Sequence, residues 1–142
     1  MEQDDEIPPD KGLNEPPAEL DALARQVIGA AIEVHRELGP GLPEEVYERA
    51  LMIELTHRGI EFARQKRIEI RYKNVVVGVA KIDLLIGGRL VVEIKSVEFL
   101  APIHRSQTLT YIRMINEVLG LLINFNVPIL KDGVRRIVQS QR

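Results

Sequence analysis

The sequence of 142 residues contains no cysteine and only 4% aromatic residues, and both shortages exclude structures and functions. Without cysteine the chain can form no disulfide, no thiolate zinc site and no cysteine nucleophile. The absence also suits a reducing compartment, so we expect a cytoplasmic protein. With few aromatics and 45% apolar residues, the core must be built mainly from Ile, Leu, Val and Ala.

Long apolar runs are lacking as well. The longest, over residues 75–80, is far too short to cross a bilayer. The N-terminus has no basic-then-apolar signal pattern. We therefore expect no membrane contact, and the length fits one domain.

The formal net charge of −2 hides an uneven distribution. Residues 1–20 contain seven acids and one base, which leaves 14 acids and 18 bases in residues 21–142, so the body is mildly basic. This permits nucleic-acid binding without requiring it. Residues 1–18 also contain four prolines and few apolar residues, which predicts a disordered acidic tail before a domain over 19–142.

The first half of this domain has helical periodicity. Apolar residues at helical spacing predict a helix over 20–38, which Gly39-Pro40-Gly41 ends. Pro43 suits the first turn of a second helix, because its missing N–H would be unpaired there anyway. Gly59 is typical of the residue after a helix end.

The apolar period then changes to two, which predicts strands joined by turns at Lys73-Asn74 and Gly87-Gly88. The second and third strands are apolar on both faces, as in the centre of a covered sheet. The expected order is α-α-β-β-β-α-β-β. The third helix is expected over 102–117, and the strands over 67–72, 75–86, 90–97, 119–125 and 134–138.

The hairpin over 81–95 contains three charged residues that point to chemistry: Asp83, Glu93 and Lys95. Glu93 and Lys95 are two apart on a strand, so they share a face. A three-residue loop, 87–89, puts Asp83 directly opposite Glu93, whereas a two-residue loop puts it on the wrong face. If Asp83 and Glu93 act together, the loop must therefore have three residues, or a bulge must have the same effect.

Two carboxylates and an ammonium among apolar neighbours are costly to bury, and close carboxylates repel each other. A divalent cation resolves both problems, because it neutralises the acids and prefers oxygen ligands. The alternative is a half-exposed hairpin with an ordinary Glu–Lys pair.

Further motifs occur in a specific order along the chain. Gly41-Leu42-Pro43-Glu44-Glu45-Val46-Tyr47 fits G-x-x-E-x-x-Y, and Gln107-Thr108-Leu109-Thr110-Tyr111 follows the hairpin acids. Together they resemble the GxxExxY family, a branch of the PD-(D/E)XK nuclease superfamily, from about residue 20 to 138. The resemblance implies an α/β, restriction-endonuclease-like core with a central mixed sheet flanked by helices.

The resemblance also implies roles for individual residues. Asp83, Glu93 and Glu44 would bind Mg²⁺ or Mn²⁺, Lys95 would assist the attacking water, and Gln107 and Tyr111 would orient the lysine or a phosphate. Simpler interpretations stay open. Glu44 could stabilise its helix N-terminus, while Gln107 and Tyr111 could form a solvated helix edge. Tyr47 fits a core position better than a catalytic one, and His104 fits a structural role better than a functional one.

We therefore expect a metal-dependent nuclease that hydrolyses phosphodiester bonds in DNA. The alternatives are a non-catalytic nucleic-acid-binding or regulatory protein with the same fold, and a nuclease for RNA or a modified nucleotide. No separate DNA-reading module is visible, so sequence-specific cutting would need a homodimer or another partner.

The acidic tail yields a first prediction. Deletion of residues 1–18 should leave the melting temperature within a few degrees of the full chain, because these residues bury too little apolar surface to offset the cost of ordering. Thermal unfolding of both proteins measures this. A large drop would mean that the tail docks on the body.

Overall fold

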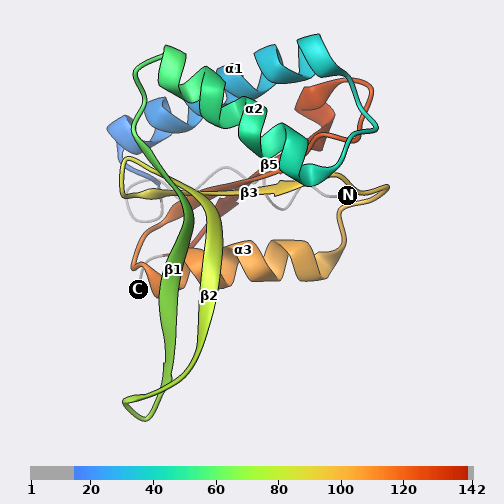
Figure 1. The fold of residues 1–142 in the computed structure, drawn as a ribbon. Helices are drawn as coiled ribbons and strands as arrows, with labels where there is room; N and C mark the ends of the chain where they lie inside the picture. Colours follow the sequence, from blue (N-terminus) through green and yellow to red (C-terminus); the bar gives the residue numbers. More distant parts are fainter. Residues whose placement is uncertain (1–14, 141–142) are drawn as a thin grey trace.

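The structure, a computed structural model, describes residues 15–140, which form three helices and one five-stranded mixed sheet (Figure 1). Most of the predicted tail, residues 1–14, lies outside the described residues. In chain order the elements are α1 (Ala18–Leu38), α2 (Glu44–His57), β1 (Phe62–Tyr72), β2 (Val75–Ile86), β3 (Leu90–Lys95), α3 (Pro102–Met114), β4 (Leu119–Asn124), the short 3-10 helix η2 (Leu130–Gly133) and β5 (Val134–Val138). None of the helices within 15–140 is both long enough and apolar enough to cross a membrane.

The strands lie side by side in chain order, from β1 to β5. Only β3 and β4 pair in parallel, and α3 forms the crossover between them, as a parallel connection requires. Helices α1 and α2 cover one face of the sheet and α3 covers the other (Figure 1). Val92 packs in the core between the sheet and helices α1 and α2, and Val91 packs in the core that includes Ile112 of α3. Strand β3 is therefore apolar on both sides.

The β2–β3 turn has three residues, the length required for Asp83 to lie opposite Glu93. Leu84 pairs with Val92 and Ile86 with Leu90, which leaves three residues, 87–89, in the loop. Gly87 and Gly88 both adopt positive φ, at 59° and 74°, where glycine is strongly favoured. The predicted three-residue loop is therefore confirmed.

The prediction that the whole of β2 lies in a covered sheet is wrong. Leu84 and Ile86 are fully buried, but Val75 and Val77 are each 62% exposed. The reason is geometric: β1 and β2 extend well past the helices, so no layer covers their distal half (Figure 1).

Element boundaries differ at smaller scale. The α3 helix ends at Met114 rather than at residue 117, because Asn116 adopts a left-handed φ of 58°. Pro43 is the N-cap of α2 rather than a residue of its first turn. Ala18, assigned to the tail from sequence, is the first residue of α1.

Gly133 allows a close backbone approach that fixes the loop after β3. A Cβ on Gly133 would lie 2.2 Å from the carbonyl oxygen of Asn124. Asn124 in turn binds both backbone groups of Val97 through its side-chain amide, at 3.0 Å and 2.9 Å. The glycine therefore lets β4 hold the segment that follows Lys95.

Replacing Gly133 with alanine should destabilise the protein by about 1–3 kcal/mol or more, the usual cost of forcing atoms into a packed site. Gly78→Ala is the matched control, because its Cβ would meet nothing closer than 3.8 Å. Urea unfolding of the two variants measures the difference. Equal stability of both would contradict this account of Gly133.

Candidate active site

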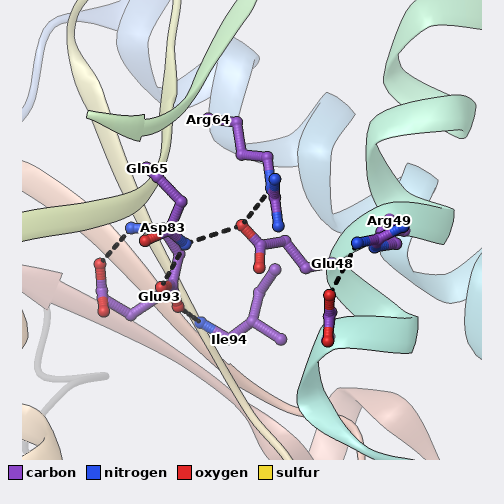
Figure 2. A network of polar contacts seen from close by, with 8 residues as sticks. Glu48, Arg49, Arg64, Gln65, Asp83, Glu93 and Ile94 are labelled. Atoms are coloured by element: carbon purple, nitrogen blue, oxygen red, sulfur yellow. Dashed lines mark hydrogen bonds and ion pairs between the residues drawn. The ribbon is translucent and has the colours of Figure 1, made fainter.

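The site forms where β2 and β3 separate. Their pairing runs only from Ile86 and Leu90 to Leu84 and Val92, so the backbone N–H groups beyond this point need other partners. The N–H of Asp83 donates to the Glu93 carboxylate at 3.0 Å, and the N–H of Ile94 donates to the Asp83 carboxylate at 2.9 Å (Figure 2). The two acids thus replace the missing strand contacts and are held next to each other.

We call this point of separation, with Asp83 and Glu93 at its centre, the fork. It is an unfavourable place for negative charge. Glu93 is only 3% exposed, and burial together with the Asp83 carboxylate raises its pKa from 4.5 to about 8. Burial also raises the pKa of Asp83, although the hydrogen bond from the Ile94 N–H opposes this change. In the absence of a bound cation, the pair therefore binds protons more tightly than free carboxylates do.

Lys95 lies two residues after Glu93, at the end of β3, and is half-buried. Its positive charge lowers the pKa of both Asp83 and Glu93, so it acts on the fork electrostatically. The structure thus brings together the three hairpin residues that the sequence singles out.

Two further polar side chains reach the fork that the sequence did not indicate. The side-chain amide of Gln65 donates to Asp83 at 3.3 Å and to Glu48 of α2 at 2.9 Å (Figure 2). Glu48 is 7% exposed and also accepts from Arg64 at 3.3 Å. Gln65 has a positive φ of 51°, a rare conformation for a side-chain-bearing residue. The one available signal was helical spacing, since Glu48 lies four residues after Glu44.

Glu44 lies at the start of α2 and near the fork, where its charge raises the pKa of Asp83. Its carboxylate accepts a 3.4 Å hydrogen bond from the Ser96 N–H, and the Ser96 hydroxyl donates to the Leu42 carbonyl at 2.6 Å. These contacts join the segment after Lys95 to the segment before α2. Glu44 therefore has a positional role in addition to its charge.

Tyr47 occupies the core, as the sequence favoured. It is fully buried and stacks on Phe125, with ring centroids 4.6 Å apart. Its hydroxyl donates to the Gly39 carbonyl and accepts from the Leu42 N–H, so it closes the α1–α2 loop. The tyrosine of the G-x-x-E-x-x-Y pattern thus fixes the loop that leads to Glu44.

Helix α3 approaches the acids from the opposite face of the sheet. Tyr111 is half-buried, and burial followed by the charges of Glu93 and Asp83 raises its pKa, while a hydrogen bond with Gln107 lowers it. Gln107 is exposed. His104 accepts a 3.0 Å hydrogen bond from the Ala101 N–H and so caps the helix, a structural role.

The donor set at the fork suits a hard divalent cation, because carboxylate oxygens are what Mg²⁺ and Mn²⁺ prefer. Within residues 15–140, however, no three His, Cys, Asp or Glu side chains are grouped closely enough to hold a metal ion. Asp83 and Glu93 therefore form a pair, with Glu44 and Glu48 further away. A pair is sufficient for Mg²⁺, which commonly keeps several waters and uses one or two carboxylates.

A pocket of about 420 Å³ opens beside the fork, at the carboxyl ends of β3 and β4. Its lining includes Arg105, Arg135 and Asn124 but none of the hairpin residues Asp83, Glu93 and Lys95. The pocket is therefore adjacent to the acids rather than formed by them.

The raised pKa of Glu93 predicts how stability depends on pH in EDTA. The folded state keeps the Glu93 proton up to about pH 8, whereas the unfolded chain releases it near 4.5. The free energy of unfolding should therefore be highest at low pH within this window and fall as pH rises, by at most about 1.4 kcal/mol per unit. The raised pKa of Asp83 adds a contribution of the same sign.

Glu93→Gln should flatten this dependence, because glutamine still accepts the Asp83 N–H but does not titrate. Urea unfolding at several pH values between about 5 and 8 measures both slopes. A slope that survives the substitution unchanged would assign the effect to other groups.

Comparison with known proteins agrees with this geometry. The model of the PD-(D/E)XK nuclease superfamily matches residues 21–137, which run from the first turn of α1 to the penultimate residue of β5. No curated protein and no solved structure shows a significant match to the chain. The matched region contains the sheet, its helices and both acids of the fork, and the chain belongs to the PD-(D/E)XK nuclease superfamily.

Proposed function

We propose that the protein is a metal-dependent nuclease that hydrolyses phosphodiester bonds in DNA, with Asp83, Glu93 and Lys95 as its central residues. The observation that carries the proposal is the buried Glu93 carboxylate next to the half-buried Asp83 carboxylate, both with raised pKa values, with Lys95 two residues after Glu93 on β3. A protein fold tolerates such a pair at a cost in stability. A function that needs two adjacent anions explains why the pair is present.

In this proposal Asp83 and Glu93 hold Mg²⁺ or Mn²⁺. When bound, the cation supplies positive charge that stabilises the attacked phosphate and activates water as the nucleophile. Glu93 uses one oxygen for a backbone N–H, and Asp83 uses one oxygen for the Ile94 N–H and the other for the Gln65 amide. Each carboxylate oxygen has two lone pairs, so both acids keep capacity for ligation. Lys95 carries three N–H donors on a flexible stem, which suits it to holding a phosphate oxygen or the attacking water.

Glu44 and Glu48 complete the acidic side of the site. Four residues apart on α2, they share a helix face directed at the fork. Glu48 reaches Asp83 through Gln65, and Glu44 acts on Asp83 by its charge. We propose that Glu44 contacts the cation through water and that Glu48 positions Asp83 through the Gln65 amide.

Gln107 and Tyr111 have a supporting role in the same proposal. They are hydrogen-bonded to each other on α3, and Tyr111 feels the charges of both fork carboxylates. This arrangement suits the orientation of a phosphate above Lys95. Together with Gly41, Glu44 and Tyr47, these residues support assignment to the GxxExxY branch of the superfamily.

A non-catalytic protein that binds nucleic acid or regulates a partner is the second candidate function. It is favoured by the hydrogen bonds of Asp83 and Glu93 to backbone N–H groups, which give both acids a structural purpose. Under this alternative the fork stabilises the fold and performs no chemistry.

Cleavage and metal-dependent stability separate the two functions. The wild-type protein is incubated with single-stranded and duplex DNA and with RNA, in Mg²⁺, in Mn²⁺ or in EDTA. The nuclease proposal expects cleavage of DNA that requires the metal. No cleavage of any substrate, together with no thermal stabilisation by millimolar Mn²⁺, would favour the non-catalytic function.

Two variants sharpen this test. Asp83→Asn should abolish both cleavage and stabilisation by metal, because one of the two anionic ligands is lost. Lys95→Ala should abolish cleavage but keep the stabilisation, which for a ligand at about 100 times its Kd amounts to roughly 2.7 kcal/mol. Thermal unfolding with a Mn²⁺ titration, beside the cleavage assay, measures both. If Lys95→Ala instead lowers the melting temperature of the metal-free protein as well as abolishing cleavage, Lys95 serves as a structural partner of the acids.

A further inference from the structure

The distal half of the β1–β2 hairpin is an uncovered two-stranded ribbon. We call residues 66–81 the arm; it extends past α3 and away from the other strands (Figure 1). Tyr72 is 64% exposed and Val75 62% exposed. An isolated two-stranded ribbon gains little stability by itself. The arm therefore adds little to the core, and its exposure points to a role outside it.

Positive charge is concentrated on the arm. It contains five basic residues and one acid, a net charge of +4 in a chain whose total is −2, so the remaining residues carry −6. The basic residues are Lys66, Arg67, Arg71, Lys73 and Lys81, and all are exposed. Outside the arm, residues 21–142 contain 13 acids and 13 bases, so the arm holds the whole positive excess of the body. A strongly basic ribbon of this kind is the electrostatic pattern of a polyanion-binding element.

The strand register makes part of this charge unfavourable in the free protein. Arg67 and Lys81 are directly opposite each other in the β1–β2 pairing. Like charges in opposing positions destabilise a sheet. Neither has an ion-pair partner within residues 15–140, whereas Arg71 pairs with Glu69 at 2.8 Å. An anion from outside the described residues would relieve the repulsion.

The opposing cations lie close to the proposed active site. Lys81 precedes Asp83 by two residues, and Arg67 follows Gln65 by two residues, so the pair stands about 7 Å along the strands from the fork. This is about the axial rise of two base pairs of duplex DNA, which is roughly 3.4 Å each. Arg71 lies further along β1, just beyond the register shift that follows Ile70.

We propose that the arm binds the backbone of B-form duplex DNA, with Arg67, Lys81 and Arg71 contacting phosphates, and so guides the strand to the fork. The inference rests on the proposed nuclease function for its choice of ligand. The shape favours DNA: the major groove of B-DNA admits a two-stranded ribbon, whereas that of A-form RNA is too narrow. The arm thus supplies cations that the fork, with its surplus of acids, lacks.

The test compares two double variants that remove the same charge. Arg67→Gln with Lys81→Gln changes the arm, and Arg25→Gln with Arg36→Gln changes exposed arginines of α1. Binding to a fluorescent DNA duplex is measured by anisotropy in EDTA at several salt concentrations. The arm variant should bind about tenfold or more weakly and lose about 0.9 per contact from the salt slope, while the control keeps the wild-type slope. Melting temperatures check that both variants fold.

Equal affinity and equal slope of the two variants would overturn the proposal. Tighter binding of an RNA duplex of the same sequence would overturn the choice of DNA. A dimer in sedimentation that the arm variant dissolves, with DNA affinity unchanged, would assign the arm to a second copy of the chain instead.

The design separates this inference from the nuclease proposal. If the wild type binds DNA through the arm but cleaves nothing with either metal, the arm stands and the nuclease assignment fails. If the wild type cleaves and the arm variant cleaves with an unchanged KM, the nuclease stands and the arm fails. A wild type that neither binds nor cleaves nucleic acid overturns both.

Discussion

The separation of β2 from β3 after Leu84 and Val92 is the constraint on which the site depends. A buried backbone N–H without a partner is costly, and at this point the sheet itself supplies none. The carboxylates of Asp83 and Glu93 satisfy the N–H groups of Ile94 and Asp83. The same hydrogen bonds hold two acids side by side in a poorly solvated place. One arrangement therefore satisfies the backbone N–H groups and also brings two carboxylates together.

The surrounding elements keep this fork in a defined position. Tyr47 closes the α1–α2 loop, and Ser96 ties the segment after Lys95 to that loop. From β4, Asn124 binds Val97 on the other side of the same segment. The G-x-x-E-x-x-Y pattern is thus explained largely by packing and loop closure, with Glu44 as the member that also acts on the fork by charge.

Charge is distributed unevenly between the fork and the arm. The fork combines Asp83 and Glu93 with nearby Glu44 and Glu48, against which stand Lys95 on β3 and Arg64, the ion-pair partner of Glu48. The arm carries five more basic residues, and it begins directly after Gln65, which has a positive φ. A polyanion would be repelled by the metal-free fork and attracted by the arm. A cation at the fork and phosphates along the arm would satisfy both regions together, because each then meets charge of opposite sign.

The sequence alone determined the local geometry of the hairpin. The two-residue period placed Glu93 and Lys95 on one face, and the demand that Asp83 face Glu93 required the three-residue loop that Ile86 and Leu90 define. These are local relations, fixed by strand geometry. Only the tertiary structure decided that Glu48 and Gln65 reach the fork, since they come from other elements. It also decided that the valines at 75, 76, 77 and 79 are exposed, because apolar character identifies a strand but not whether the helices are long enough to cover it.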